Sequence, residues 1–313
     1  MQKIKFKKGL IIGPSGIGAV HFREFLNNGF EEIGFIGKSK SKNRSFIVNL
    51  KKFQNIKIIN LKDFKNIKKF KPDVVSICSP FDKHLSHILK CKKHSKYIIV
   101  EKPFIWSKKK LIKGKNLQNS LRLLSESNNQ IVINLPMVSL AKQIIQKKEV
   151  TKNIDYFKFC YFTKGKQKNE NIAVDLLPHA LSFLLTILKK KIINFNIINV
   201  KKLKSSWSCK IKIDNIICIF QFTQDLFRKE SILKFSLNNN HYVRHQKDID
   251  GKRINYLVKN NRKKISLNNP MNEYLCYLLK SFNNKNKIKI NNNLVLKIMK
   301  IKEDLLSFKK FNI

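Results

Sequence analysis

The sequence is short of acidic residues, and it lacks several patterns that would identify a function directly. Against 65 lysine and arginine residues stand only 20 aspartate and glutamate residues, which gives a formal net charge of +45. The six cysteines form no CxxC pair and no cysteine–histidine spacing suited to zinc, so we assign no metal site. They are scattered, several of them in apolar runs. We interpret them as reduced, buried thiols and expect a reducing compartment.

No apolar run approaches the roughly 20 residues of a membrane span, and the apolar Leu10-Ile11-Ile12 is too short for a secretory signal. We therefore expect a soluble, cytoplasmic protein without a membrane partner. The basic residues follow the whole chain, with no basic helix, arginine-rich arm or aromatic RNA-binding motif. We expect no specific nucleic-acid partner, and a basic nucleic-acid-binding protein is the least favoured alternative. The charge would attract anionic ligands such as dinucleotides and nucleotide sugars.

Strand-like and helix-like segments alternate through the first half of the chain, which is typical of a doubly wound parallel sheet with right-handed crossovers. The predicted strands are residues 8–12, 33–36, 56–59, 73–78, 97–100 and 130–134, and the predicted helices are residues 16–27, 61–70, 81–92 and 108–125. The fold class is therefore α/β, beginning with a doubly wound parallel Rossmann domain over residues 1–136.

The pattern changes to strand-like segments separated mostly by short polar turns, which favours antiparallel hairpins. The predicted strands are residues 155–162, 192–200, 208–213, 216–223, 231–237 and 254–258, the predicted helices are residues 175–188, 271–282 and 294–308, and the predicted solvated loops are residues 238–240, 259–264 and 283–293. We expect residues 137–313 to form an α+β domain with a mostly antiparallel sheet, for substrate binding and oligomerisation.

A glycine-rich turn follows the first predicted strand and opens the first helix, as a dinucleotide-binding turn should. Gly13 and Gly18 stand where the tight turn and the close helix packing need glycine, while Ser15 stands where the backbone approaches the pyrophosphate. A serine is small, and its hydroxyl can bond a phosphate. The predicted cofactor-binding residues of this turn are Gly13, Ser15, Gly16, Ile17 and Gly18. Taken alone, the turn is also compatible with an ordinary strand–helix connection.

The end of the second predicted strand lacks the carboxylate that bonds the adenosine ribose of NAD. Lys38 and Ser39 stand at that place, with Arg44 just beyond. A hydroxyl and cations suit a 2′-phosphate better than a 2′-hydroxyl, so we predict NADP rather than NAD, with Lys38 and Ser39 in contact with it. The alternative is that these lysines only reflect the general excess of lysine.

Two later strands carry the most informative residues. The fourth strand is followed by Ser79-Pro80 and then by His84, and the fifth strand ends in Glu101-Lys102-Pro103. Ligands of open α/β sheets bind at the carboxyl ends of the strands, so Lys102 is a candidate for work on a ligand. We count Ser79, Pro80, His84, Glu101 and Lys102 among the cofactor-binding candidates, although a packing or capping role is favoured for His84.

Asp175 and His179 lie four residues apart on a predicted apolar helix and therefore share one of its faces. We place Pro178 within the first turn of that helix, where a missing N–H does little harm. An imidazole with an ordinary pKa of about 6.5 suits proton exchange with a hydroxyl. The alternative is that His179 is only a core histidine whose hydrogen bonds are satisfied.

Together these motifs resemble the Gfo/Idh/MocA family of nicotinamide-dependent sugar oxidoreductases. The resemblance implies that Lys102 reaches the nicotinamide end of the cofactor and the reacting oxygen of the substrate. It implies that His179 is the general acid and base, and that Asp175 positions the substrate or tunes the imidazole. Asn171 replaces the family's usual glycine before the helix, and Asn134-Leu135-Pro136-Met137 lacks the arginine that relatives often have there.

The function expected from this resemblance is hydride transfer between NADP, or NAD, and a secondary alcohol or ketone of a sugar, inositol or nucleotide sugar. Such an enzyme is a dehydrogenase or reductase acting on CH–OH groups, and we expect a homodimer or homotetramer. The alternative from another class is a catalytically inactive NAD(P)-binding sensor or partner subunit. Lys102, Asp175 and His179 separate the two, because an inactive relative usually loses at least one of them.

Overall fold

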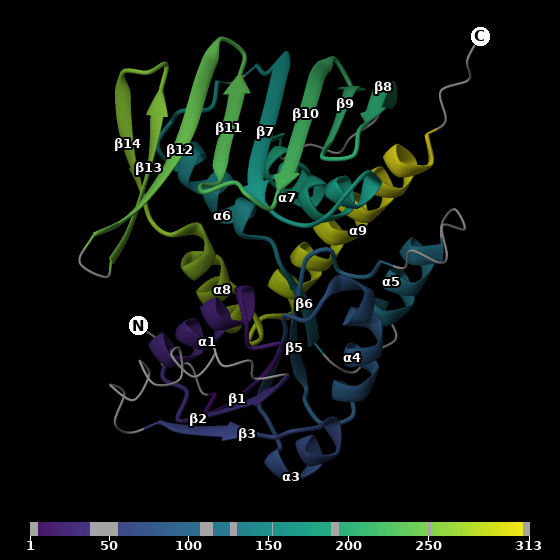
Figure 1. The fold of residues 1–313 in the computed structure, drawn as a ribbon, viewed down its shortest axis with the longest axis vertical. Coiled ribbons are helices and arrows are strands. Elements are labelled where there is room, and N and C mark those ends of the chain that lie inside the picture. The colour runs from purple at the N-terminus through teal and green to yellow at the C-terminus, as the bar shows by residue number, and fades with distance from the viewer. Residues whose placement is uncertain are drawn as a thin grey trace. The chain divides into compact units, whose positions relative to one another are not determined.

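The computed structural model describes residues 6–37, 56–106, 115–125, 130–151, 153–188, 194–249 and 252–308. The chain divides into two compact units (Figure 1). The first unit comprises Met1–Asn134 and Tyr274–Leu296, and the second comprises Leu135–Glu273 and Lys297–Ile313. The first half of the chain therefore completes its unit with a segment from near the C-terminus.

A parallel six-stranded sheet forms the first unit, in the order β3-β2-β1-β4-β5-β6 (Figure 1). The strands are β1 (Lys8–Ile12), β2 (Glu32–Ile36), β3 (Lys57–Asn60), β4 (Val74–Ile77), β5 (Tyr97–Glu101) and β6 (Gln130–Asn134). The order reverses between β1 and β4, which creates the switch point where open α/β sheets bind ligands. The predicted doubly wound parallel sheet is confirmed, with strand boundaries within about one residue of those expected.

The helices of the first unit follow the strands in the expected alternation. They are α1 (Ile17–Asn27), α3 (Ile67–Phe70), α4 (His84–Cys91) and α5 (Lys115–Ser125), with single 3₁₀ turns at Phe64–Asn66 and Phe81–Lys83. Every residue of β4 is buried, as in a central strand covered on both faces. Residues 107–114, which belong to the predicted helix 108–125, lie outside the described part of the chain.

The C-terminal helices α8 (Pro270–Ser281) and α9 (Lys285–Ser307) contribute to both units. The prediction that residues 283–293 form a solvated loop is wrong, because α9 begins at Lys285 and includes residues 285–293. Asn291 is buried, and its side-chain amide accepts from the Ile133 N–H and donates to the Ile133 carbonyl, both over 2.9 Å. Asn291 thereby satisfies the main chain of β6, the edge strand of the sheet.

The second unit is built on an eight-stranded sheet in the order β14-β13-β12-β11-β7-β10-β9-β8. Its neighbouring strands are antiparallel except for β7 and β10, so the predicted mostly antiparallel sheet is confirmed. The strands are β7 (Tyr156–Lys164), β8 (Phe195–Lys202), β9 (Ser206–Ile213), β10 (Ile216–Asp225), β11 (Ile232–Leu237), β12 (Asn240–Ile249), β13 (Lys252–Lys259) and β14 (Lys263–Leu267).

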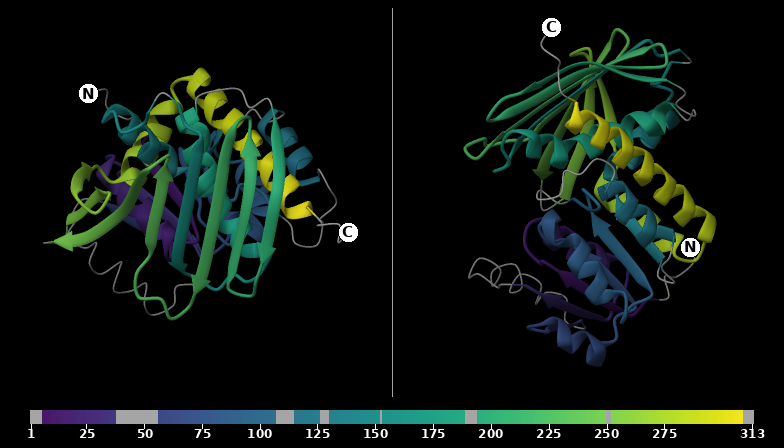
Figure 2. Two further views of the ribbon diagram at one scale, coloured as in Figure 1. Left: turned by 90° about the horizontal axis from the view of Figure 1, so that it is seen from above. Right: turned by 90° about the vertical axis from the view of Figure 1, so that its right-hand side faces the viewer.

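Helices α6 (Pro136–Gln146) and α7 (Glu170–Leu188) pack in this unit, and α7 lies along one face of the sheet (Figure 2). The core between α7 and the sheet contains closely packed aromatic rings. The ring centroid of Phe183 in α7 lies 4.8 Å from that of Phe235 and 5.8 Å from that of Phe159. By length and composition α7 would be able to cross a membrane, but 78% of its apolar window is buried inside the protein. It is a core helix.

Several elements of the second unit differ from the prediction. The chain adds α6, β12 and β14, none of which was expected, and the predicted loop over residues 259–264 contains the start of β14. α7 begins at Glu170 rather than Asp175, so Pro178 lies inside the helix and not in its first turn. β12 is mostly polar or charged and β14 begins with two lysines, and this polarity hides their strand character.

Candidate active site

The glycine-rich turn between β1 and α1 brings strand and helix very close together. Gly13 has a φ of +84°, and its N–H donates to the Ile36 carbonyl over 2.8 Å. A Cβ atom at Gly18 would lie 2.0 Å from the Gly13 carbonyl oxygen, so only glycine fits there without a shift of the backbone. These are the contacts of a tight turn followed by a close strand–helix packing.

The middle of the same turn is open. Ser15 and Gly16 are exposed, Gly16 has a φ of +59°, and a Cβ atom at Gly16 would meet no atom within 4 Å. Helix α1 begins at Ile17, so the positive end of its dipole lies beside this open space. The turn therefore fits the pyrophosphate of a dinucleotide, which the main chain from Ser15 to Ile17 would hold.

The end of β4 lies against the glycine-rich turn. A Cβ atom at Gly13 would lie 3.0 Å from the Cys78 carbonyl oxygen and 3.1 Å from the Ser79 Cα. Pro80, the next residue, is exposed. The Ser79 hydroxyl is 2.8 Å from Nδ1 of His87, a half-buried ring on α4. Ser79 and Pro80 thus lie beside the glycine-rich turn, and the contact with His87 of α4 fixes the Ser79 hydroxyl.

His84 connects two turns at the carboxyl edge of the sheet. Its ring is buried, with Nε2 2.8 Å from the Ser79 carbonyl oxygen and Nδ1 3.0 Å and 3.1 Å from the carbonyl oxygens of Pro103 and Phe104. Burial lowers the pKa of His84, although these carbonyls oppose the effect. With both nitrogens directed at the main chain, His84 holds the turns in place rather than facing a ligand.

Lys102 is partly exposed and directly follows β5, at the same sheet edge as the glycine-rich turn. The peptide bond between Lys102 and Pro103 is cis. Pro103 and Phe104 are buried and are held by His84, so the residues after Lys102 are anchored in the protein. Lys102 is therefore a cation presented by a fixed turn, at the edge where this sheet type binds ligands.

Glu101 does not face outward with Lys102. Its carboxylate is buried, and Oε1 is 2.7 Å from Nε2 of His21 and accepts from Nδ2 of Asn134 over 2.6 Å. Burial raises the pKa of Glu101, but the hydrogen bond and charge of His21, the Asn134 amide and the charge of Lys102 outweigh it, and the pKa is lowered. Glu101 is thus a buried anion beneath the turn.

Asp175 and His179 lie on one face of α7, and both are partly exposed. Asp175 accepts a hydrogen bond of 2.6 Å from the Gln224 side-chain amide of β10. The ring of His179 meets Tyr161 of β7 edge to face, with 5.6 Å between centroids. The second unit therefore holds a carboxylate and an imidazole side by side at the surface of its core helix.

The position of Gln224 depends on Gly165, which directly follows the neighbouring strand β7. Gln224 is buried, and its side-chain oxygen accepts from the Gln167 N–H over 3.0 Å. A Cβ atom at Gly165 would lie 2.3 Å from that oxygen. Glycine at residue 165 thus leaves room for the amide that contacts Asp175.

The sequence did not identify His21, Ser76 or Gln224, all of which support a candidate residue. His21 interrupts the apolar first helix, which is a signal for a buried histidine with a specific partner. Gln224 lies in an alternating strand and gives no comparable signal. Lys38, Ser39 and Arg44 lie outside the described residues.

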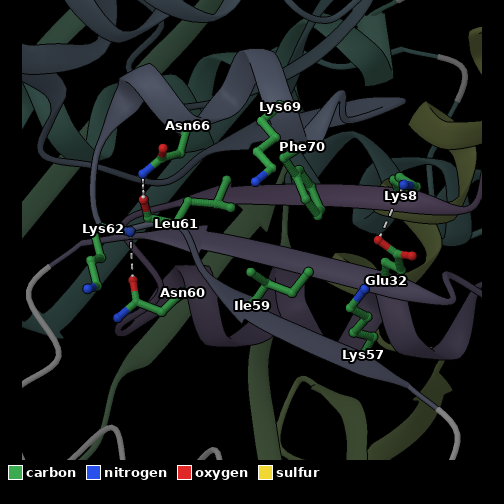
Figure 3. A pocket seen from close by; sticks show the side chains of 10 residues that line it. All are labelled: Lys8, Glu32, Lys57, Ile59, Asn60, Leu61, Lys62, Asn66, Lys69 and Phe70. Carbon is green, nitrogen blue, oxygen red and sulfur yellow. Dashed lines mark hydrogen bonds and ion pairs between the residues drawn. The ribbon is translucent and has the colours of Figure 1, made fainter.

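A separate cavity of about 510 Å³ lies along the outer strands of the first sheet (Figure 3). It is lined by Lys8, Glu32, Lys57, Ile59, Asn60, Leu61, Lys62, Asn66, Lys69 and Phe70. None of these residues belongs to the glycine-rich turn, the end of β4 or the Lys102 turn. Lys8 pairs with Glu32 over 3.4 Å. In a chain so rich in lysine, four lysines around a cavity do not identify a ligand.

The part of the chain that the structure describes contains no group of three His, Cys, Asp or Glu side chains arranged to hold a metal ion.

Comparison with known proteins gives a family match within the first unit. Residues 7–132 match the model of a family described as an oxidoreductase family with an NAD-binding Rossmann fold. No curated protein matches the sequence. The matched residues contain the glycine-rich turn, the end of β4 and the Lys102 turn, so the match covers the proposed cofactor site.

Solved structures extend the similarity in fold to nearly the whole chain. The WlbA dehydrogenase from Thermus thermophilus, in complex with NAD and UDP-GlcNAcA, has a TM-score of 0.66 at 10% identity, covering 97% of this chain and 95% of that one. UDP-N-acetylglucosamine 3-dehydrogenase from Acidithiobacillus ferrooxidans has a TM-score of 0.65 at 9% identity, covering 96% of each chain. The dehydrogenase MviM from Clostridium difficile has 0.65 at 12%, covering 96% and 98%.

Proposed function

We propose that this chain is an oxidoreductase of the Gfo/Idh/MocA type, whose family model matches residues 7–132, and that it acts on a secondary alcohol or ketone of a sugar or nucleotide sugar. The observation that carries the proposal is Lys102, a partly exposed cation on an anchored turn at the same sheet edge as an open, phosphate-compatible glycine turn. A purely structural turn would not require a charged side chain at that place.

The cofactor, when bound, supplies or accepts the hydride, and the protein orients the reactants and handles the proton. The Lys102 ammonium donates a hydrogen bond to the substrate oxygen at the reacting carbon and stabilises the negative charge that develops there. The first domain thus contributes binding and electrostatic stabilisation.

Proton exchange is assigned to the second unit. His179 accepts the hydroxyl proton when an alcohol is oxidised and returns it when a ketone is reduced. Asp175 lies one helical turn before it and positions the substrate or the ring. The Gln224 amide holds this carboxylate in place over 2.6 Å. His179 and Asp175 are both partly exposed, which a proton exchange with a substrate requires.

A nucleotide-linked sugar is the substrate class that we favour. Two proteins of similar fold are named for UDP-N-acetylglucosamine or were solved with a UDP sugar. A formal net charge of +45 raises the local concentration of an anionic diphosphate substrate in a salt-dependent way. An inositol or an unphosphorylated sugar has no charge for that field to attract.

NADP is the cofactor that we favour over NAD, on the evidence of Lys38 and Ser39 at the expected ribose position. Fluorescence titration with NADPH and NADH at physiological salt tests this preference. We expect tighter, saturable binding of NADPH, and a Lys38→Glu variant should remove the difference. Equal dissociation constants for the two cofactors would contradict the preference without affecting the oxidoreductase assignment.

Turnover with a panel of sugars and UDP sugars tests the reaction itself. We expect His179→Ala to lose about 10²–10⁴-fold in kcat while keeping NADPH affinity. His241→Ala is the matched control, because His241 lies in β12, which is separated from β7 by one strand in the sheet order. Unchanged kcat in the His179 variant would remove its catalytic role. Saturable cofactor binding without turnover on any member of the panel would favour the inactive sensor instead.

We also propose that the enzyme works as a homodimer or homotetramer in the cytoplasm. All six cysteines are free thiols, five of them buried, which suits a reducing compartment. Light scattering at several protein concentrations measures the assembly state, and a monomer throughout would exclude the oligomer.

A further inference from the structure

A chain of buried polar side chains lies directly beneath the Lys102 turn. His21 of α1 is fully buried, with Nδ1 2.6 Å from the Ser76 hydroxyl and Nε2 2.7 Å from Oε1 of Glu101. Asn134 of β6 donates to the same carboxylate oxygen over 2.6 Å. Side chains from α1 and β6 therefore meet at the buried Glu101 carboxylate of β5, and Ser76 of β4 extends the chain through His21.

The order serine, histidine, carboxylate is also that of a hydrolase triad. Ser76 has no exposed surface, however, and neither has His21. A substrate carbonyl has no access to the Ser76 hydroxyl, so hydrolysis by these groups is excluded. The network therefore acts through Lys102, the residue that follows Glu101, and not on a substrate directly.

The geometry favours a charged His21. A buried carboxylate needs a cation or several strong donors, and the 2.6 Å and 2.7 Å contacts to Glu101 have the length of charge-assisted hydrogen bonds. Burial by itself lowers the pKa of His21, but the side chains of Cys78 and Glu101 outweigh burial and raise the pKa to about 10. An imidazolium donates from both nitrogens, to Ser76 and to Glu101.

Glu101 connects this charge to Lys102 in two ways. Its second carboxylate oxygen, Oε2, accepts from the Lys102 N–H over 3.3 Å. The charge of Lys102 is also one of the causes that lower the pKa of Glu101, and such coupling acts equally in both directions. An anionic Glu101 therefore favours the ammonium form of Lys102 and restrains its main chain.

We propose that His21 is a positioning residue for Lys102: it keeps Glu101 ionised, and Glu101 holds the turn and the charge of Lys102. The proposal deepens the function given above, because it rests on Lys102 being the group that meets the substrate. It assigns Glu101 to the support of Lys102 and not to direct contact with the cofactor.

The groups that face His21 come from every element packed around it. They are Ser76 and Cys78 at the end of β4, Glu101 of β5 and Asn134 of β6, with Glu24 on its own helix. Cys78 is the largest of the causes that raise the pKa of His21, and Glu101, the carboxylate in direct contact with the ring, is the next.

The first experiment is NMR of the protein with ¹⁵N-labelled histidine rings, which reports the protonation of each nitrogen. His21 is assigned by the signal that His21→Gln removes, and His94 serves as a reference at the end of α4. We expect both His21 nitrogens to stay protonated up to about pH 9, while an ordinary histidine loses its charge near its usual pKa of about 6.5. A neutral His21 ring at neutral pH would overturn the proposal.

The second experiment measures Lys102 itself, by competitive acetylation with acetic anhydride and mass spectrometry. Only the uncharged amine reacts, so removing a charge that favours the ammonium form should raise the rate at Lys102 by about three- to tenfold. We expect this rise in Glu101→Gln and equally in His21→Gln, because a buried Glu101 without its cation takes up a proton. His94→Gln is the matched control and should leave Lys102 unchanged.

The double variant His21→Gln/Glu101→Gln keeps the test valid if a single variant fails to fold, because it leaves no unpaired buried charge. It should raise the Lys102 rate no further than either single change, as expected for two residues acting through one path. Unchanged Lys102 reactivity in the double variant would overturn the proposal. The labelling of Lys96, an exposed residue on the preceding loop, is the internal reference for the rate at Lys102.

Activity distinguishes failure of the inference from failure of the proposed function. With an active substrate, His21→Gln should lower kcat about tenfold and leave the NADPH dissociation constant within about twofold. If the parent protein binds no cofactor, the proposed function fails, whereas the NMR and labelling results on His21 and Lys102 still stand. If turnover is intact in His21→Gln, the positioning role fails and the enzyme assignment stands.

Discussion

The two units support their candidate groups in different ways. In the first unit the support is charged and buried: Glu101 and His21 lie out of contact with water and meet over 2.7 Å. In the second unit the support is neutral: the Gln224 amide holds Asp175, which is partly exposed. A fixed cation on a turn needs rigid support from within, while a group that exchanges protons needs access to its partner.

The scarcity of acidic residues makes the buried ones informative. Glu101 in the first unit has a histidine partner, and Glu149 in the second accepts from Lys259 over 2.8 Å and from Lys263 over 2.7 Å. The lysine hydrogen bonds and charges outweigh burial and lower the pKa of Glu149. Glu149 ties β13 and β14 to the loop after α6, and no candidate residue adjoins it. We therefore take a buried acid as a sign of function only where a candidate functional residue adjoins it.

The largest expected effect comes from the two charged candidates themselves. Lys102→Met should lower kcat by about 10²–10⁴-fold, because the stabilisation of developing charge at the substrate oxygen is lost. Asp175→Asn keeps the shape and the contact with Gln224 and should cost about tenfold. Steady-state kinetics on one substrate measure both. Equal losses would contradict the division between a fixed cation and a tuning carboxylate.

Removing the supporting residues should lower the free energy of unfolding by different amounts in the two units. His21→Leu leaves Glu101 buried without a cation and should cost about 3–5 kcal/mol of unfolding free energy, whereas Gln224→Ala should cost about 1 kcal/mol. The raised pKa of His21 means that its contribution is complete below about pH 6.5 and is lost as pH rises through about 10.

Two tryptophans allow the units to be followed separately, because Trp106 lies in the first unit and Trp207 in the second, both buried. Urea unfolding of Trp106→Phe and Trp207→Phe backgrounds gives the stability of each. A larger loss for Gln224→Ala than for His21→Leu would reverse the comparison. His94→Leu is the control and should change stability by less than about 0.5 kcal/mol.

Glycine substitutions give a smaller effect that sharpens the same contrast. Gly18→Ala directs a Cβ at the Gly13 backbone, which cannot move without opening the turn. We expect it to lower the free energy of unfolding by about 1–3 kcal/mol and to weaken NADPH binding. Gly165→Ala meets only the end of the Gln224 side chain, which can rotate away. It should cost less than about 1 kcal/mol and lower kcat rather than cofactor affinity. Melting curves and NADPH titrations measure both.

The sequence predicts the first unit better than the second for physical reasons. Buried parallel strands such as Val74–Ile77 are apolar except for Ser76, and the glycine turn has strict steric needs, so both leave clear patterns. β12 is mostly polar or charged and β14 begins with Lys263 and Lys264, so their composition hides both strands. The burial of Asn291 against β6 depends on a contact 158 residues away in the chain, which no local pattern reveals. His21 and Gln224 were missed because their importance lies in a partner distant in sequence.

An acid effect of similar size to that of the glycine substitutions should appear in the first unit. Burial and the nearby charges of Lys90, His84 and Lys83 lower the pKa of His87 to about 4. The unfolded chain therefore binds one more proton than the folded protein between about pH 6.5 and pH 4. The stability from a neutral His87 is complete above about pH 6.5 and is lost as pH falls through about 4.

His87 is half-buried and contacts the Ser79 hydroxyl, so protonation also disturbs the rim of the proposed cofactor site. In the Trp207→Phe background we expect the Trp106 signal to show a loss of about 1 kcal/mol between pH 6.5 and pH 4.5, and His87→Gln should remove that loss. The Trp207 signal, read in the Trp106→Phe background, should show no effect of His87→Gln. If His87→Gln alters the acid stability of both units equally, the two units unfold as one, and the separate stabilities assumed above have to be replaced by a single one.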